Sequence, residues 1–182
     1  MNITVFGGSQ PKPGEPAYLE AMRLGALLGK TGHTVLTGGY IGTMEAVSRG
    51  AAESGGHVVG VTCEEIESWR AVLANPWVQE EWRYDTLRER LFSLIDNCDA
   101  AIALPGGAGT LAEISLTWNM LIVQALPPRP LILVGPAWQA IFANFFTNLG
   151  AYVAERDQLW LSFVPNAAAA AQTIAGLPAG KL

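Results

Sequence analysis

The chain has 182 residues, of which half are apolar and 15% are charged, and its formal net charge at pH 7 is −5. This composition is typical of a globular protein that can bury a core, and it excludes a disordered chain. The sequence also has no dense cluster of lysine and arginine, which argues against a general nucleic-acid-binding protein.

No apolar run is long and uncharged enough to cross a bilayer, and the first residues pass directly into a strand pattern without a signal peptide. We therefore expect a cytoplasmic protein that does not enter a membrane. Nothing in the sequence marks a linker or a domain boundary, so residues 1–182 are expected to form one domain.

The cysteines and histidines indicate neither a disulfide framework nor a metal site. Cys63 and Cys98 lie far apart in the sequence, and Cys98 precedes an apolar strand, as a small buried residue would. His33 and His57 each precede a strand and have no metal-ligand spacing. We expect no metal.

Short β-branched runs alternate with longer helical patterns along the chain. Because a strand–helix repeat gives parallel strands with right-handed crossovers, the sequence predicts a Rossmann-like, doubly wound α/β fold with a mostly parallel sheet and helices on both faces. The expected strands are 3–6, 34–37, 57–61, 100–104, 130–134 and 160–164, and the expected helices are 16–30, 43–53, 85–97, 111–124, 138–149 and 167–174.

The segment 63–84 is the least regular part of the chain. It carries Trp69, Trp77 and Trp82 among acidic residues, and Asn75-Pro76 interrupts any regular element. Two interpretations stay open: a packed excursion with an exposed edge, or a lid or partner contact that shapes a pocket.

The stretch 104–113 carries the strongest functional signal. It joins an apolar strand to a long apolar helix through three glycines and Thr110. Glycines let a ligand approach the backbone closely, and the N–H groups at a helix start attract anions. This pattern indicates a phosphate site, but Thr110 with Glu113 also fits a capping box that would only end the helix.

Two further glycine loops follow the first and second expected strands, at 7–9 and 38–42. In a doubly wound sheet, ligands bind beyond the carboxyl ends of the strands. The three loops should therefore meet at one edge of the sheet, which supports a binding site there.

These motifs together resemble the LONELY GUY (LOG) family, long mislabelled lysine decarboxylase. The segment 105–113 matches the family signature Pro-Gly-Gly-x-Gly-Thr-x-x-Glu, and 38–44 is similar to its Gly-Gly-Gly-x-x-Gly-x-Met loop. Glu89-Arg90 matches the Glu-Arg-Lys of the helix before the signature strand, and 5–9 resembles the opening strand and loop. The sequence departs from the family at Tyr40, Leu91 and Ala112, where glycine, lysine and glutamate are usual.

The resemblance implies hydrolysis of the N-glycosidic bond of a nucleoside 5′-monophosphate, such as AMP or an N6-substituted AMP, to a free base and ribose 5-phosphate. It implies that Glu113 is the catalytic carboxylate, that Arg90 orients the substrate, and that no cofactor is needed. The implied substrate-binding residues are Ser9, Gly39, Gly42, Thr43, Gly106, Gly107, Gly109 and Thr110.

Two helices carry additional indications. Arg90 lies at the border of an apolar stripe, from which its side chain can reach a cleft or cover apolar surface with its stem; the resemblance favours the cleft. The helix 111–124 has a second apolar face formed by Leu116, Met120 and Val123, which predicts a homodimer.

A non-catalytic nucleotide-binding or sensor protein of the same fold is the alternative, since relatives of this fold include molybdenum-cofactor-binding proteins. A pure binder does not need the pair Arg90 and Glu113. A NAD-dependent oxidoreductase is disfavoured because the first turn lacks the full dinucleotide fingerprint.

Overall fold

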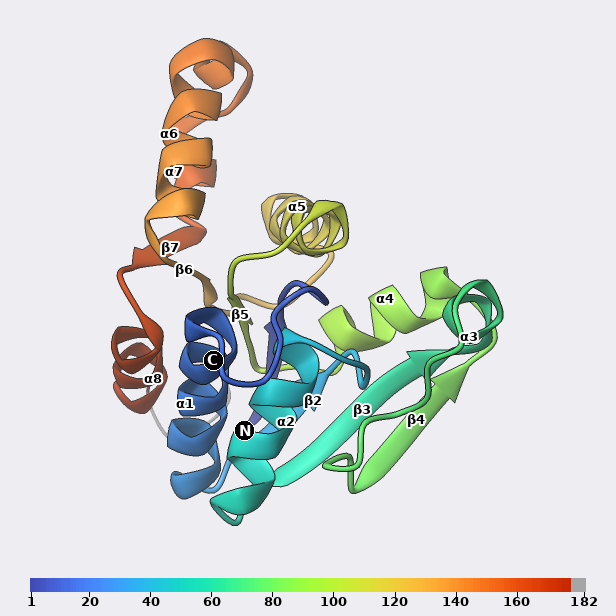
Figure 1. Cartoon of the computed structure of the whole chain (residues 1–182). Helices are drawn as coiled ribbons and strands as arrows, with labels where there is room; N and C mark the ends of the chain where they lie inside the picture. The colour runs from blue at the N-terminus through green and yellow to red at the C-terminus, as the bar shows by residue number, and fades with distance from the viewer. Residues whose placement is uncertain (178–182) are drawn as a thin grey trace.

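The computed structural model describes residues 1–177, and its centre is a seven-stranded sheet in the order β4-β3-β2-β1-β5-β6-β7 (Figure 1). All neighbouring strands are parallel. The sheet therefore confirms the predicted Rossmann-like arrangement. The strands are β1 (Asn2–Phe6), β2 (Thr34–Thr37), β3 (His57–Cys63), β4 (Glu80–Tyr84), β5 (Ala100–Ala103), β6 (Leu131–Val134) and β7 (Leu161–Val164).

Helices cover both faces of this sheet. Helices α1, α2 and α8 pack on one face, and α4, α5 and α6 pack on the other. The helices are α1 (Pro16–Lys30), α2 (Thr43–Glu53), α3 (Glu64–Trp69), α4 (Leu87–Asp96), α5 (Ala108–Ile122), α6 (Pro136–Leu149), the 3₁₀ turn η1 (Gly150–Tyr152), α7 (Glu155–Gln158) and α8 (Ala167–Ala175).

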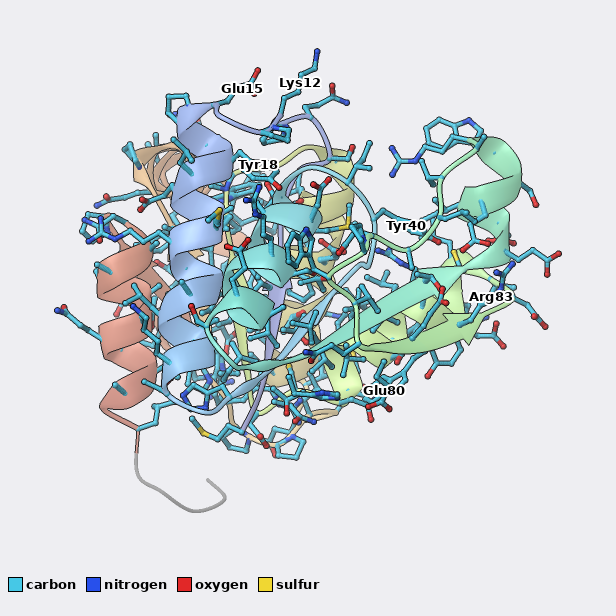
Figure 2. All side chains as sticks on the ribbon, turned by 60° about the horizontal axis from the view of Figure 1, so that its bottom comes forward. Lys12, Glu15, Tyr18, Tyr40, Glu80 and Arg83 are labelled. Atoms are coloured by element: carbon cyan, nitrogen blue, oxygen red, sulfur yellow. The ribbon has the colours of Figure 1, made fainter. Side chains whose placement is uncertain are left out.

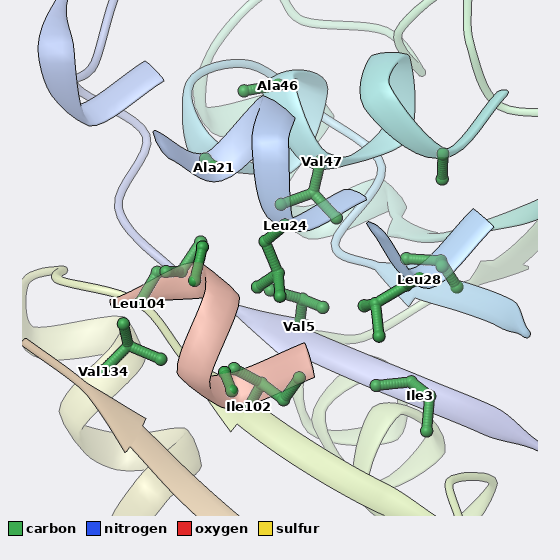
Figure 3. Close-up of a cluster of buried hydrophobic side chains, with 14 of the residues drawn as sticks. Ile3, Val5, Ala21, Leu24, Leu28, Ala46, Val47, Ile102, Leu104 and Val134 are labelled. Atoms are coloured by element: carbon green, nitrogen blue, oxygen red, sulfur yellow. The ribbon is translucent and has the colours of Figure 1, made fainter. Parts of the chain in front are cut away.

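Figure 3 shows how the first of these layers is built. Leu24 and Leu28 of α1 lie over Ile3 and Val5 of β1, and Val47 of α2 packs beside them. Parallel strands that are covered on both faces need apolar side chains in both directions, and β5 and β6 are buried along their whole length.

The segment 63–84 is more regular than the sequence indicated, because it contains α3 and an additional strand, β4. The strand pairs with β3 from Val59–Glu80 to Cys63–Tyr84. It lies at the edge of the sheet, and its residues Glu80, Glu81 and Arg83 are exposed. Charged residues are common on edge strands, where they oppose pairing with another chain, but they hide the apolar pattern on which the prediction depended.

A capping box fixes the start of α4. The backbone N–H of Glu89 donates to Thr86 Oγ1 (3.2 Å), and the backbone N–H of Thr86 donates to Glu89 Oε2 (3.1 Å). Such reciprocal bonds stabilise a helix N-terminus. Glu89 therefore has a structural role that sets the position of the next residue, Arg90.

The segment from α6 to α7 extends away from the sheet (Figure 1). Trp118 of α5 makes edge-on contacts with Phe142, Phe145 and Phe146 of α6, with ring centroids 5.7–6.1 Å apart.

Within residues 1–177, no helix is both long enough and apolar enough to span a membrane.

Candidate functional site

The loops after β1, β2 and β5 meet at the carboxyl edge of the sheet, where the chain changes direction between β1 and β5. The backbone N–H of Gly8 donates to the carbonyl of Pro105 (3.2 Å), and the N–H of Thr43 donates to the carbonyl of Gly8 (2.9 Å). Such a switch point is where doubly wound folds bind their ligands.

Several glycines in these loops serve packing between the loops. Gly42 has a φ of +74°, and a Cβ there would lie 2.7 Å from Ser9 Cα. A Cβ on Gly106 would lie 2.9 Å from the backbone nitrogen of Gly8. Gly107 and Gly109 differ, because a Cβ on either would meet nothing within 4 Å. Their backbone therefore faces open space that a ligand can occupy.

A cavity of about 290 Å³ opens at this point, close to the lower end of the size range of small-molecule sites. It collects residues from five loops or helices that are distant in sequence. The lining residues are Gly7, Gly8, Ser9, Gln10, Tyr40, Met44, Ile66, Arg70, Arg90, Gly107, Ala108, Gly109, Thr110 and Glu113.

Six of the ten residues that the resemblance indicated line this cavity: Ser9, Arg90, Gly107, Gly109, Thr110 and Glu113. The other four, Gly39, Gly42, Thr43 and Gly106, are not among the lining residues, so their role as substrate contacts stays a prediction. Gly39 packs with Thr62 Cγ2 behind the cavity, Gly42 and Gly106 allow close loop contacts, and Thr43 is buried under Gly7. These four residues shape the site from behind.

The start of α5 forms one wall of the cavity. The helix begins at Ala108 with Gly107 as its N-cap residue and with no side-chain cap. Thr110 therefore lies inside the first turn, where it is buried. The alternative interpretation, a capping box of Thr110 with Glu113, is wrong. The first N–H groups of a helix have no partner within the helix, so this uncapped end, with its positive dipole, suits an anion.

Arg90 projects from α4 into the opposite side of the cavity and is only 6% exposed. Its Nε donates to the carbonyl of Val61 (2.7 Å), and its Nη2 donates to the carbonyl of Gly38 (3.0 Å). These bonds fix the guanidinium at the ends of β2 and β3. A rigidly held charge loses little freedom when it meets a ligand.

Glu113 projects from the second turn of α5 towards Arg90. Burial raises the pKa of its carboxyl group from 4.5 to about 7, and the charge of Arg90 partly opposes this change. The residue is partly exposed to the cavity. A carboxyl group that titrates near neutral pH can exchange protons efficiently in a reaction.

Tyr40, which is labelled in Figure 2, is fully buried and lines the cavity beside the end of β3. Its hydroxyl group accepts from the N–H of Cys63 (2.8 Å) and lies 3.0 Å from the carbonyl of the same residue. The guanidinium carbon of Arg90 lies 5.5 Å from the centre of its ring. This departure from the family pattern therefore supports Arg90 directly.

Arg70 and Ile66 also line the cavity, and neither was identified as a site residue from the sequence. Both belong to the segment 63–84, for which a part in shaping a pocket was one of the two open interpretations. The described part of the chain contains no group of three or more histidine, cysteine or acidic residues that could hold a metal ion.

The parallel sheet, with a glycine loop and an uncapped helix start at its switch point, defines a Rossmann-like protein with a candidate ligand site at that edge. Residues 1–123 match the model of the SLOG cluster4 family. The chain belongs to this LOG-type family.

Relatives include a cytokinin riboside 5′-monophosphate phosphoribohydrolase of Mycobacterium tuberculosis, 32% identical over 134 residues, or 74% of this chain and 70% of that protein. A probable enzyme of the same name from Oryza sativa subsp. japonica is 34% identical over 128 residues, or 69% of this chain and 51% of that protein. Among solved structures, the molybdenum cofactor binding protein of Rippkaea orientalis has a TM-score of 0.72 at 25% identity, with 96% of this chain and 94% of that chain covered.

Proposed function

We propose that the protein hydrolyses the N-glycosidic bond of a nucleoside 5′-monophosphate and releases the free base and ribose 5-phosphate. The observation that carries this proposal is Glu113, a carboxyl group whose pKa is raised to about 7 and which faces Arg90 in a cavity next to a helix N-terminus. The names of the relatives support this reaction and suggest AMP or an N6-substituted AMP as substrate.

The phosphate would bind at the start of α5. Gly107, Gly109 and Thr110 line the cavity there, and they offer backbone N–H groups and one hydroxyl group to phosphate oxygens. Ser9 faces the same space from the loop after β1. The ribose would then lie against the next turn of α5, where Glu113 projects.

Departure of the base leaves positive charge on the ribose ring, as in the hydrolysis of other glycosides. An ionised Glu113 can stabilise this charge and also position and deprotonate the attacking water. Arg90 would hold the leaving base or the sugar, since its guanidinium is fixed by two backbone carbonyl groups. The reaction needs no cofactor.

A non-catalytic binding protein is the second candidate, because the structurally similar protein of Rippkaea orientalis is described as binding the molybdenum cofactor. A pure binder has no use for a desolvated carboxyl group, which raises the free energy of the folded state above neutral pH. The position of Glu113 therefore favours an enzyme.

The test is incubation of the purified protein with a panel of nucleoside monophosphates that includes AMP, followed by chromatography for free base and ribose 5-phosphate. Glu113→Gln serves as the inactive control. Arg88→Gln is the matched control, because Arg88 is exposed and lies outside the cavity. If no member of the panel loses its base while several bind, the protein is a nucleotide-binding protein and the enzyme proposal is wrong.

A further inference from the structure

The cavity has two chemically different ends that are linked by a chain of contacts. Glu113 interacts electrostatically with Arg90, Arg90 lies 5.5 Å from the ring of Tyr40, and Arg70 lies 6.0 Å from the same ring. In this order of contacts, Glu113 next to the glycine loop stands first and Arg70 stands last.

The strand order gives the scale of this separation. The loop that carries Gly107 follows β5, and Arg70 follows α3 and β3. Three strand spacings separate β5 from β3, so the two strands from which these segments start lie roughly 14 Å apart at the usual interstrand distance. In a nucleotide whose phosphate lies on α5, the base is the part that extends towards Arg70.

Arg70 is positioned by aromatic rings and not by an acid of the protein. Its guanidinium carbon lies 5.7 Å from the ring centre of Trp69, in addition to its contact with Tyr40. In residues 1–177 its side chain forms no hydrogen bond or ion pair, and its Nε is buried without a partner. The nearby Glu67 pairs instead with Arg83 (2.7 Å), at the outer edge of the sheet (Figure 2).

The backbone carbonyl groups nearest to Arg70 already accept hydrogen bonds. The carbonyl of Ile66 accepts from the N–H of Arg70, and the carbonyl of Arg70 accepts from the N–H of Val72. The carbonyl of Tyr40 accepts a hydrogen bond from Asn75 Nδ2 (3.0 Å), and the hydroxyl group of Tyr40 accepts one from the N–H of Cys63. The base end therefore offers the donors of Arg70 and favours a base edge that carries acceptors.

We propose that Arg70 recognises the acceptor edge of a 6-oxopurine, so that inosine or guanosine 5′-monophosphate binds in preference to AMP. This inference rests on the proposed function and refines the base that the names of the relatives suggest. A guanidinium fork matches the two acceptors O6 and N7 of such a base, whereas adenine presents an N6 donor beside N7. A cavity of about 290 Å³ suits a mononucleotide, which leaves Arg70 to the base and not to a second phosphate group.

The experiment measures binding without turnover. In the Glu113→Gln background, calorimetry with inosine and guanosine monophosphates and with AMP gives three dissociation constants. We expect the two 6-oxopurine nucleotides to bind about 5- to 150-fold more tightly than AMP, the range that one bidentate contact with a base provides. Arg70→Met keeps the apolar stem and should abolish this preference.

Arg70→Gln is the sharper variant, because an amide group matches the N6 and N7 positions of adenine. It should shift the preference towards AMP, and the matched control Arg88→Gln should leave all three constants unchanged. Equal binding of AMP and inosine monophosphate, or an unchanged preference in Arg70→Met, overturns the inference even if the wild-type protein hydrolyses nucleotides. If the protein binds 6-oxopurine nucleotides preferentially but the wild type hydrolyses none of them, Arg70 recognises the base and the protein is not a hydrolase.

Discussion

Replacement of Glu113 by glutamine should make the protein more stable and less active. Burial raises the pKa of this carboxyl group from 4.5 to about 7, so the folded protein keeps a proton that the unfolded chain loses between these values. Stability must then fall as the pH rises from about 4.5 through 7, and it stays low above that window. The full difference in pKa corresponds to about 3 kcal/mol of unfolding free energy.

Glutamine has nearly the same shape as glutamate but carries no charge, so it removes this cost. We expect Glu113→Gln to raise the unfolding free energy by up to about 3 kcal/mol at pH 8 and by only about 1 kcal/mol at pH 5.5. Urea unfolding at the two pH values measures both differences as shifts of the midpoint at constant slope. Glu155→Gln, at an exposed position in α7, is the control and should change stability by less than about 0.5 kcal/mol.

The same variant should lose turnover by about a hundredfold or more, because an amide group can neither take a proton nor offset the charge of the ribose ring. A gain in stability combined with a loss of activity is the usual mark of a strained functional group. If Glu113→Gln is no more stable than the wild type at pH 8, the carboxyl group is not desolvated. Turnover within about threefold of wild type on the best substrate would exclude the catalytic role.

Three further predictions follow from the site and from α5. A nucleoside without its 5′-phosphate should bind at least about tenfold more weakly than the monophosphate in calorimetry, since each charge-assisted hydrogen bond contributes about 1.5–3 kcal/mol; equal affinities would refute the phosphate site. Arg90→Ala should lower kcat, and its combination with Glu113→Gln should cost less than the product of the two single effects, because the groups act together; multiplicative losses would mean independent roles. The protein should be a homodimer that uses the face of Leu116, Met120 and Val123. Val123 is 61% exposed, while the other two are partly buried in their own protomer, so Val123→Glu should give a monomer in light scattering. A wild-type protein that is monomeric at micromolar concentration would disprove the dimer.

The bounds of several elements could be predicted from local sequence alone. Helix α1 runs over Pro16–Lys30 and α2 over Thr43–Glu53, as the sequence predicted. Proline suits the first turn of a helix, and glycine suits the residues that follow its end. These signals lie within a few residues of the boundary, so they need no knowledge of the rest of the fold.

The parts that the sequence concealed depend on contacts between distant residues. Strand β4 is held by its pairing with β3, and the residues Glu80 and Glu81 that begin it have little intrinsic preference for a strand. The start of α5 was misjudged for a different reason. Thr110 and Glu113 have the spacing of a capping box, but the helix begins at Ala108 and Thr110 is buried against Gly106.

Tyr40 shows how a departure from a family pattern can be visible in a sequence while its meaning is not. The resemblance predicts a small residue there, and a large side chain next to a glycine loop suggests an obstructed site. The structure instead buries the ring completely and holds its hydroxyl group at Cys63. The guanidinium groups of Arg90 and Arg70 both contact this ring. One side chain therefore links the residue that faces Glu113 to the residue that we propose to recognise the base. If Arg70 recognises the base as proposed, a change at Tyr40 should alter the substrate preference as well as Arg90, because Tyr40 contacts both guanidinium groups.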